Sequence, residues 1–366
     1  MNRKEISMER NQNPNRIAYL DALRVFAAIA VVLLHTSARK WDVVDVMGTQ
    51  WGALNLYNGM ARWCVPVFAM VSGALYLPRD IDVKTIYSKY VHKMATVYVL
   101  WAVIYLVAIL MADLLTSGGF NLPWTTVVYE GIKGAYHTWY IVMLIGFYMC
   151  LPLLCPMVKN MDTAKYFLML AFAFQFALPQ VLNLLRSFAP TIISPIVDAL
   201  SVLLDRFYLQ MVTSFTGFFV AGYVFSRVEL QQKIRRILYI LGFVGVVTTV
   251  LLNAAASRKI NYPLETYLYC FNVNVAITAV AIFVWFRYNY QGKGAFHTWI
   301  QKFSEYSFGV YLVHPFVMII LELLGMDTLM FHPLLAVPVI CVAVIVVAFV
   351  ISYILNKIPI TKKYLI

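Results

Sequence analysis

The sequence predicts an all-α integral membrane protein of about ten transmembrane helices around a polar central tunnel. The chain of 366 residues is 62% hydrophobic and only 13% charged, with a mean hydropathy of +0.75, well above the apolar share of a soluble globular domain. Its apolar residues form runs long enough to cross a bilayer core of about 30 Å as helices. Ionisable residues inside some of these runs predict the tunnel, because charges within a membrane usually face a bundle interior or a wet cavity.

Hydropathy divides the chain into ten candidate spans. They cover residues 17–39, 52–77, 90–115, 138–158, 165–185, 207–226, 234–253, 267–288, 304–325 and 334–356. The loops between them are too short for a separate soluble domain. The chain is therefore predicted as an N-terminal tail (1–16), one transmembrane domain (17–356) and a C-terminal tail (357–366).

Basic residues predict the orientation of these spans. With the N-terminus in the cytosol, 20 of the 29 lysines and arginines fall in cytosolic segments and seven in outer loops, while Arg24 and Arg62 lie within spans. This asymmetry predicts that both termini are cytosolic. The net charge of +12 does not indicate a nucleic-acid partner, because the basic residues stand in short clusters between apolar runs, where they also attract lipid headgroups.

Three ionisable residues share the first span. Asp21 and Arg24 are three residues apart, and His35 follows eleven residues after Arg24. Eleven residues complete almost three helical turns, so Arg24 and His35 share one face, about 16 Å apart in depth. We interpret this polar stripe as functional, because intramembrane charges are costly. The alternative is a buried Asp21–Arg24 pair that only fixes helix packing, with His35 bonded to a neighbouring backbone.

The second span holds a third intramembrane charge and several small residues. Arg62 lies near the middle of the membrane, where it needs an anion, a carbonyl or water, so a functional role and a pair with an acid such as Asp21 both stay open. Pro66 predicts a kink, because it lacks a backbone donor. Ser72 and Gly73 are small enough for close helix contact, and we interpret them as packing residues.

Aromatic and imidazole side chains mark two later spans. The fourth span opens with His137, Trp139 and Tyr140, and the two aromatic residues there are either site residues or interfacial anchors. The ninth span holds Tyr311 and His314, which share a helix face, and Pro315 follows directly. His314 is a second intramembrane imidazole, with a helix-bundling role and a functional role both open.

These residues resemble the acyltransferase-3 family of integral-membrane acyltransferases, which includes bacterial O-acetyltransferases of surface polysaccharides. Four elements carry the resemblance in matching order: Leu20-Asp21-Ala22-Leu23-Arg24 with His35 after ten further residues; Val65-Pro66-Val67-Phe68 with Ser72-Gly73; His137-Thr138-Trp139-Tyr140; and Ser307-Phe308-Gly309-Val310-Tyr311-Leu312-Val313-His314-Pro315. The first and last elements are the more specific. Thr138 departs from the family pattern, which typically has a leucine at this position.

The resemblance implies a ten-helix enzyme in the plasma membrane of a bacterium. It implies that an acyl group, above all acetyl, passes from cytosolic acyl-CoA to a hydroxyl at the outer face. The implied partners are acyl-CoA, an envelope glycan or lipid-linked sugar, and membrane lipids. Acyl-CoA is then a cosubstrate, with no permanently bound cofactor and no metal.

The resemblance and the polar stripe together suggest roles for the residues. His35 would deprotonate the acceptor hydroxyl or become acylated itself. Arg24, together with Arg62, would neutralise donor charge or polarise a carbonyl, and Asp21 would hold Arg24 in place. The resemblance assigns the other residues to the donor path (Trp139, Tyr311 and His314) and to the acceptor side (His137).

Two other classes of function use the same features. Charged spans and kinked helices also describe a secondary transporter of an amino acid or a glycan. A purely structural protein could use the polar stripe to assemble subunits. Counter-flow of radiolabelled solute without acyl product would identify the transporter, whereas release of coenzyme A from acetyl-CoA would identify the enzyme.

Overall fold

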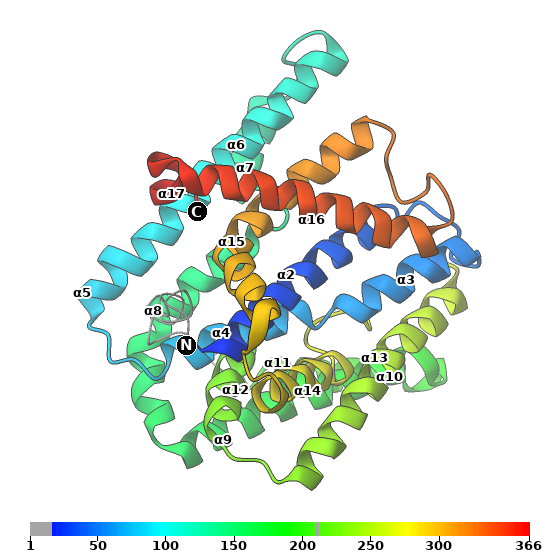
Figure 1. Cartoon of the computed structure of the whole chain (residues 1–366). Coiled ribbons are helices and arrows are strands. Elements are labelled where there is room, and N and C mark those ends of the chain that lie inside the picture. The colour runs from blue at the N-terminus through cyan, green and yellow to red at the C-terminus, as the bar shows by residue number, and fades with distance from the viewer. Residues whose placement is uncertain (1–16, 210–211) are drawn as a thin grey trace.

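The computed structural model describes residues 17–209 and 212–366, which fold only into helices and connecting loops (Figure 1). The predicted N-terminal tail, residues 1–16, lies outside the described residues. The α-helices are α2 (Ala18–Ala38), α3 (Thr49–Ala61), α4 (Cys64–Tyr76), α5 (Val83–Thr85), α6 (His92–Ser117), α7 (Trp124–Lys133), α8 (Trp139–Lys159), α9 (Met161–Ala171), α10 (Leu178–Phe188), α11 (Ser194–Asp205), α12 (Thr216–Arg227), α13 (Gln232–Ile260), α14 (Val273–Asn289), α15 (Gly294–Leu323), α16 (Pro333–Lys357) and α17 (Pro359–Tyr364). The π-helices η1 (Ile86–Val91) and η2 (Phe172–Ala177) and the 3-10 turn η3 (Thr191–Ile193) continue or join them.

Seven helical segments in the described part of the chain are long and apolar enough to cross a membrane. They are Ala18–Ala38, Val83–Leu115, Trp139–Lys159, Met161–Phe188, Gln232–Ile260, Gly294–Leu323 and Pro333–Lys357. These segments match seven of the predicted spans and confirm a multi-pass membrane protein. The other three spans correspond to α3 with α4, to α12 and to α14, which are shorter helices. The count of ten crossings stays a prediction.

The second predicted span is broken rather than kinked. α3 ends at Ala61, and α4 begins at Cys64, so the break precedes Pro66. Pro66 is the third residue of α4. The first four N–H groups of any helix have no acceptor within the helix, so the N–H that proline lacks costs no helical hydrogen bond at this position. The first helical bond of α4 then runs from Val67 N to Trp63 O over 3.0 Å. Proline therefore starts a new helix here at little cost.

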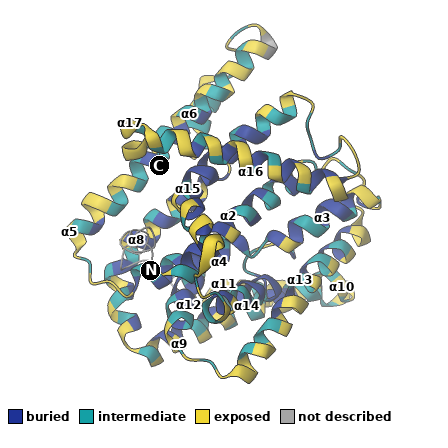
Figure 2. Cartoon of the chain, viewed as in Figure 1, coloured by how far each residue is buried: buried dark blue, intermediate teal, exposed yellow. Residues whose placement is uncertain are grey.

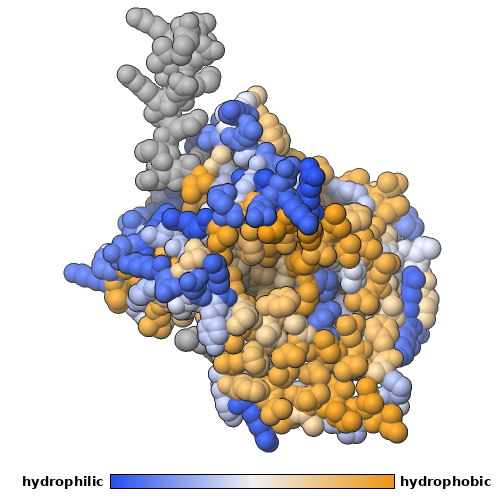
Figure 3. All heavy atoms as spheres, turned by 90° about the horizontal axis from the view of Figure 1, so that it is seen from below, coloured by the Kyte–Doolittle hydropathy of each residue, from blue (hydrophilic) through white to orange (hydrophobic). Residues whose placement is uncertain are grey.

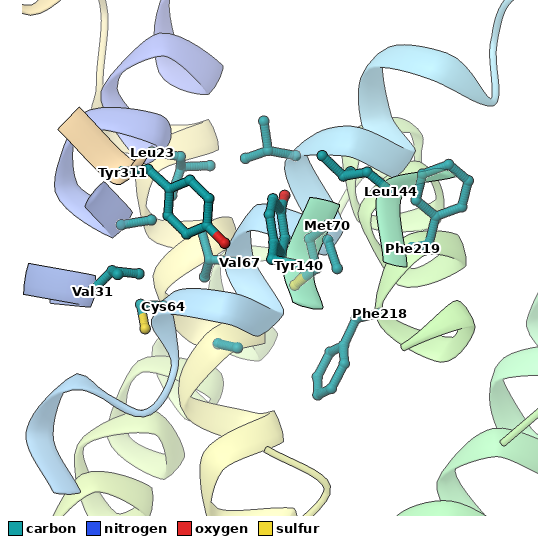
Figure 4. Packing of buried hydrophobic residues seen from close by; sticks show 14 of the residues in the cluster. Leu23, Val31, Cys64, Val67, Met70, Tyr140, Leu144, Phe218, Phe219 and Tyr311 are labelled. Carbon is teal, nitrogen blue, oxygen red and sulfur yellow. The ribbon is translucent and has the colours of Figure 1, made fainter. Parts of the chain in front are cut away.

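Two glycines bring α4 and α12 into backbone contact. A Cβ atom built on Gly73 would lie 1.7 Å from the carbonyl oxygen of Phe219, and one on Gly222 would lie 1.8 Å from that of Met70. No larger residue fits either position without separating the helices. The prediction that Gly73 serves helix packing is confirmed. Side chains of α2, α4, α8 and α12 fill the core around this contact (Figure 4).

Burial separates inner helices from outer ones (Figure 2). In the most apolar stretch of α2 and in that of α15, 56% of the residues are buried. In the corresponding stretch of α13, only 22% are buried. The outer helices expose large apolar side chains such as Leu153 and Phe243. Figure 3 shows one face covered by hydrophobic residues, with hydrophilic residues gathered along one side of it. Such a surface suits a lipid environment, and the two inner helices are those that carry the polar stripe and the late histidine.

The C-terminal segment folds back onto the bundle. After α16, residues 359–364 form α17, and Trp101 of α6 donates a hydrogen bond from Nε1 to the carbonyl oxygen of Leu365 at 2.9 Å. Ile366 is buried. The last ten residues, predicted as a tail, are therefore docked against α6, and their cytosolic location stays a prediction.

Candidate active site

The polar stripe of α2 is present as the helical spacing requires. Asp21 is buried and lies 3.8 Å from Arg24, whose side chain is 39% exposed. Ser304 of α15 donates a hydrogen bond to Asp21 Oδ1 at 2.9 Å. One carboxylate oxygen thus faces both Arg24 and a neighbouring helix. His35 lies near the other end of α2 and is partly exposed.

His35 pairs with His314, which the sequence placed 279 residues away. His35 Nδ1 and His314 Nε2 are 2.7 Å apart, and the two ring planes are only 5° from parallel. A nitrogen separation of 2.7 Å is shorter than the contact distance of stacked ring faces. The rings therefore meet edge to edge, nearly in one plane, as an in-plane hydrogen bond requires.

Pro315 explains how the orientation of His314 is fixed. A residue at position 315 of a helix would normally donate its N–H to the carbonyl oxygen of Tyr311, but proline has no N–H. His314 Nδ1 lies 2.7 Å from that free carbonyl oxygen. A carbonyl only accepts, so His314 Nδ1 carries the hydrogen, and Nε2 of the neutral ring is an acceptor.

This arrangement determines which nitrogen of His35 is basic. Because His314 Nε2 accepts, His35 Nδ1 donates the hydrogen bond between the two rings. Nε2 of a neutral His35 then holds its lone pair and makes no hydrogen bond to the described residues. His314 is fully buried, whereas His35 is partly exposed. The pair therefore presents one free imidazole lone pair backed by a buried imidazole.

Aromatic groups surround this pair. The ring of Tyr136 lies edge-on to His35 at 5.1 Å between centroids, and that of His137 lies 5.5 Å from His314. The Tyr311 hydroxyl donates to the carbonyl oxygen of His137. Both ring nitrogens of His137 are buried, and neither has a hydrogen-bond partner in the part of the chain that the structure describes. His137 thus lies beside the histidine pair, and its role on the acceptor side stays a prediction.

A charged cluster beyond the pair ties the ends of α2 and α15 together. Arg39 lies 2.6 Å from Glu322, which also accepts a hydrogen bond from Lys40. That hydrogen bond to the Glu322 carboxylate raises the pKa of Lys40 above its ordinary value. His35 and His314 sit on these two helices, so the cluster helps to keep them in register.

A cavity of about 360 Å³ opens beside Arg24, and Tyr311 forms part of its wall. Its lining includes Lys93, in the first turn of α6, and Ser72, Tyr140 and Tyr311. Ser72 therefore faces the cavity instead of serving packing alone. The rings of Tyr140 and Tyr311 are 5.7 Å apart and lie next to α4 (Figure 4). His35 and His314 do not line this cavity, so the predicted continuous tunnel stays a prediction.

Arg62 lies near His35 rather than at the Arg24 cavity. Its Nε donates to Asn58 Oδ1 at 2.6 Å, and its guanidinium lies 3.8 Å from Glu265. The acid that accompanies Arg62 is therefore Glu265, in the loop between α13 and α14, and not Asp21. The two intramembrane arginines stand at different levels of the bundle.

The fourth span shows what the sequence analysis missed. Trp139 does not line the Arg24 cavity, and its ring packs on Phe215 at 5.4 Å. Tyr140 lines the cavity instead, with Leu144 and Tyr148 of the same helix. The spacing of three and then four residues from His137 to Tyr140, Leu144 and Tyr148 is that of one helix face, and this signal could have separated Tyr140 from Trp139.

No metal site accompanies these residues. Among residues 17–209 and 212–366, no group of three or more His, Cys, Asp or Glu side chains is arranged to hold a metal ion.

Comparison with known proteins gives one match. Neither a search of curated proteins nor a search of solved structures found a matching protein. A family model described as an acyltransferase domain matches residues 17–353. This range contains the whole of α2, the histidine pair and the Arg24 cavity, and it covers nearly the entire chain. The chain therefore belongs to the acyltransferase-3 family and is a membrane acyltransferase.

Proposed function

We propose that this acyltransferase moves an acyl group, most simply acetyl, from cytosolic acyl-CoA to a hydroxyl of a cell-surface glycan or glycolipid. The hydrogen bond between His35 and His314 carries the proposal. It leaves a lone pair on a partly exposed imidazole nitrogen, which is the group that an acyl transfer to a hydroxyl needs as a base. His35→Ala, discussed below, tests it directly.

In the proposed reaction, His35 Nε2 removes the proton of the acceptor hydroxyl as its oxygen attacks the thioester carbonyl. The His35 imidazolium that forms is stabilised by the hydrogen bond from its Nδ1 to His314. When the carbon–sulfur bond breaks, the same proton passes from Nε2 to the departing sulfur, giving the ester and coenzyme A. An acyl-histidine relay would use the same lone pair as a nucleophile.

The Arg24 cavity is the proposed donor site. Arg24 and Lys93 place two cations around it, which suits the phosphates and the carbonyls of acyl-CoA. Tyr140 and Tyr311 form part of its wall, and Tyr311 lies one helical turn before His314. The thioester would have to pass these two rings to reach His35, so we expect them to move when the donor binds.

Arg24→Ala is expected to weaken acetyl-CoA binding roughly tenfold or more, because one charge-assisted contact is lost. Arg24→Lys should restore it only in part, because an ammonium does not reproduce the planar guanidinium. Calorimetry on the purified protein measures both affinities. Arg236→Ala, at an exposed position of α13, is the matched control. An unchanged affinity in a well-folded Arg24→Ala protein would remove Arg24 from the donor site.

The proposed reaction requires a cytosolic donor side and both termini in the cytosol of a bacterium. The distribution of basic residues, 20 against seven, supports this orientation. A cysteine introduced at Lys362 should stay unlabelled by an impermeant thiol reagent in intact cells and react after the cells are opened. A cysteine at Asp42, in the exposed loop after α2, should be labelled in intact cells. The opposite result would reverse the orientation.

The function as a whole is tested by the products. The purified protein, supplied with acetyl-CoA and envelope glycan or glycolipid, should release free coenzyme A and form an acetylated product that base hydrolyses. Counter-flow of labelled solute in vesicles without any acetylated product would favour a transporter instead. Loss of coenzyme A release in His35→Ala ties the product to the site.

A further inference from the structure

A polar cavity and an apolar groove flank η2, and neither His35 nor His314 lines them. Phe174 and Gln175 of η2 line the cavity, and Phe172 and Phe176 line the groove. α10 and α11 complete the cavity, whereas α9, α12 and α14 complete the groove. One π-helical turn therefore presents side chains to both spaces.

The cavity has the chemistry of a site for a hydroxyl-rich, negatively charged ligand. It encloses about 740 Å³. Its polar lining consists of Gln175, Asn183, Arg186, Ser201, Asp205, Arg206, Tyr208 and Thr213. Arg186 is held by Asp198 at 3.2 Å and by the hydroxyl of Ser201, whereas the exposed Arg206 has no ion-pair partner in the described part of the chain. The amides, the hydroxyls and the Asp205 carboxylate match the hydroxyls of a sugar, and the unpaired guanidinium of Arg206 matches an attached phosphate.

The groove has the opposite chemistry. It encloses about 230 Å³, and apolar side chains and one glycine form all of its lining. Four phenylalanines, Phe172, Phe176, Phe218 and Phe225, supply much of the wall. A space of this kind on helices embedded in lipid suits a hydrocarbon chain and offers nothing to a polar group.

Both spaces adjoin the end of the bundle that holds His35. The loop after α2 contacts the end of α13, where Arg258 donates to Val46 O at 3.5 Å. The next residue, Lys259, donates to the carbonyl oxygen of Ser187 in α10, one helix of the cavity. Gln180 of α10 accepts from the backbone N–H of Val273, a residue of the groove. α10 thus lines the cavity and also bonds to Val273, one residue of the groove.

A row of aromatic rings leads from the groove toward the histidine pair. Phe176 contacts Phe271 at 6.3 Å, Phe271 contacts Phe215 at 4.7 Å, and Phe215 contacts Trp139 at 5.4 Å between ring centroids. Trp139 stands two residues after His137, whose ring neighbours His314. The row ends at Trp139, whose ring also lies 6.4 Å from that of Tyr140 at the Arg24 cavity.

We propose that these two spaces bind the acceptor as a lipid-linked sugar, with its sugar and phosphate in the cavity and its lipid chain in the groove. This inference rests on the proposed function and names its acceptor class. Two adjoining spaces of opposite polarity fit an amphiphile better than a free sugar, which would leave the groove empty. The acceptor would then approach from within the membrane, opposite the donor.

Binding of a synthetic probe in the absence of acyl-CoA tests this site. The probe is N-acetylglucosamine linked through a diphosphate to a farnesyl chain, added to the purified protein in lipid nanodiscs. It should bind at least about tenfold more tightly than N-acetylglucosamine alone or farnesyl diphosphate alone, because one molecule fills both spaces.

Two variants separate the halves of the site. Arg206→Gln should weaken probe binding roughly tenfold through the lost charge on the phosphate, while Arg236→Gln, at another exposed arginine, should not. Ala276→Phe fills the groove and should remove the contribution of the farnesyl chain. Monodispersity and melting temperature identify a variant that has not folded, and Ala276→Leu then replaces Ala276→Phe.

The outcomes distinguish this inference from the proposed function. If free N-acetylglucosamine binds as tightly as the probe, or if both folded variants bind the probe as the wild type does, the inference is wrong. Release of coenzyme A by the wild type is measured separately. If probe binding depends on Arg206 but no acyl transfer is detected, the inferred binding site is supported and the proposed reaction is wrong.

Discussion

His35→Ala should be a folded protein that binds acetyl-CoA but transfers the acyl group about 10²–10⁴ times more slowly than the wild type, the usual loss for a positioned general base. Its fold should survive, because the side chain is partly exposed and bonds to one other side chain among the described residues. Release of coenzyme A in the presence of acceptor measures the rate, and calorimetry measures donor binding.

Companion variants test the mechanism. His35→Gln keeps a hydrogen-bonding side chain but cannot exchange the proton, so it should be as inactive as His35→Ala. His314→Gln retains an oxygen that can accept from His35 Nδ1 and should be more active than His314→Ala. If both His35 variants transfer acetyl at near the wild-type rate, His35 is structural, and the base must be sought at His314 or His137.

Gly222→Ala and Gly73→Ala should each destabilise the protein by about 3 kcal/mol or more, because the new methyl group meets a backbone oxygen that no side-chain rotation can clear. The Cβ atoms would lie 1.8 Å and 1.7 Å from the carbonyl oxygens of Met70 and Phe219. α4 would have to move away from α12, and Ser72, next to Gly73, would move with it. Thermal unfolding in detergent and the yield of monodisperse protein measure the effect.

Gly146→Ala is the matched control. Gly146 lies inside α8, and a Cβ atom there would meet nothing within 4 Å. Alanine is the better helix former, so this variant should be as stable as the wild type or more stable by up to about 1 kcal/mol. If Gly73→Ala and Gly222→Ala unfold at the same temperature as Gly146→Ala, the close contact of α4 and α12 is not a source of stability.

Much of the site was accessible from helical spacing. The repeat of about 3.6 residues put Asp21, Arg24 and His35 on one face, and the structure keeps them there. The spacing of Tyr311 and His314 was equally informative. Pro315 also carried a signal that was not used above: a proline leaves the carbonyl of the fourth residue before it, here Tyr311, without a helical donor. These are properties of one helix, so the local sequence is enough to define them.

Other features depended on contacts between distant segments. From the sequence, Pro66 could either kink a helix or stand near the start of one. In the folded chain it stands in the first turn of α4, which packs closely against α12. Arg62 needed an acid, and only the folded chain brings Glu265 to it. Trp139 and Tyr140 are neighbours in sequence, but α8 turns one toward Phe215 and the other into the cavity.

The sequence by itself determined the class of the protein, seven of its membrane-length helices and the polar face of α2, because hydrophobicity and helical periodicity are local properties. Only the tertiary structure decided that His35 pairs with His314, and hence which nitrogen of His35 is basic. That assignment depends on a contact between α2 and α15 across 279 residues of chain, and helical periodicity carries no information about the partner of a helix face.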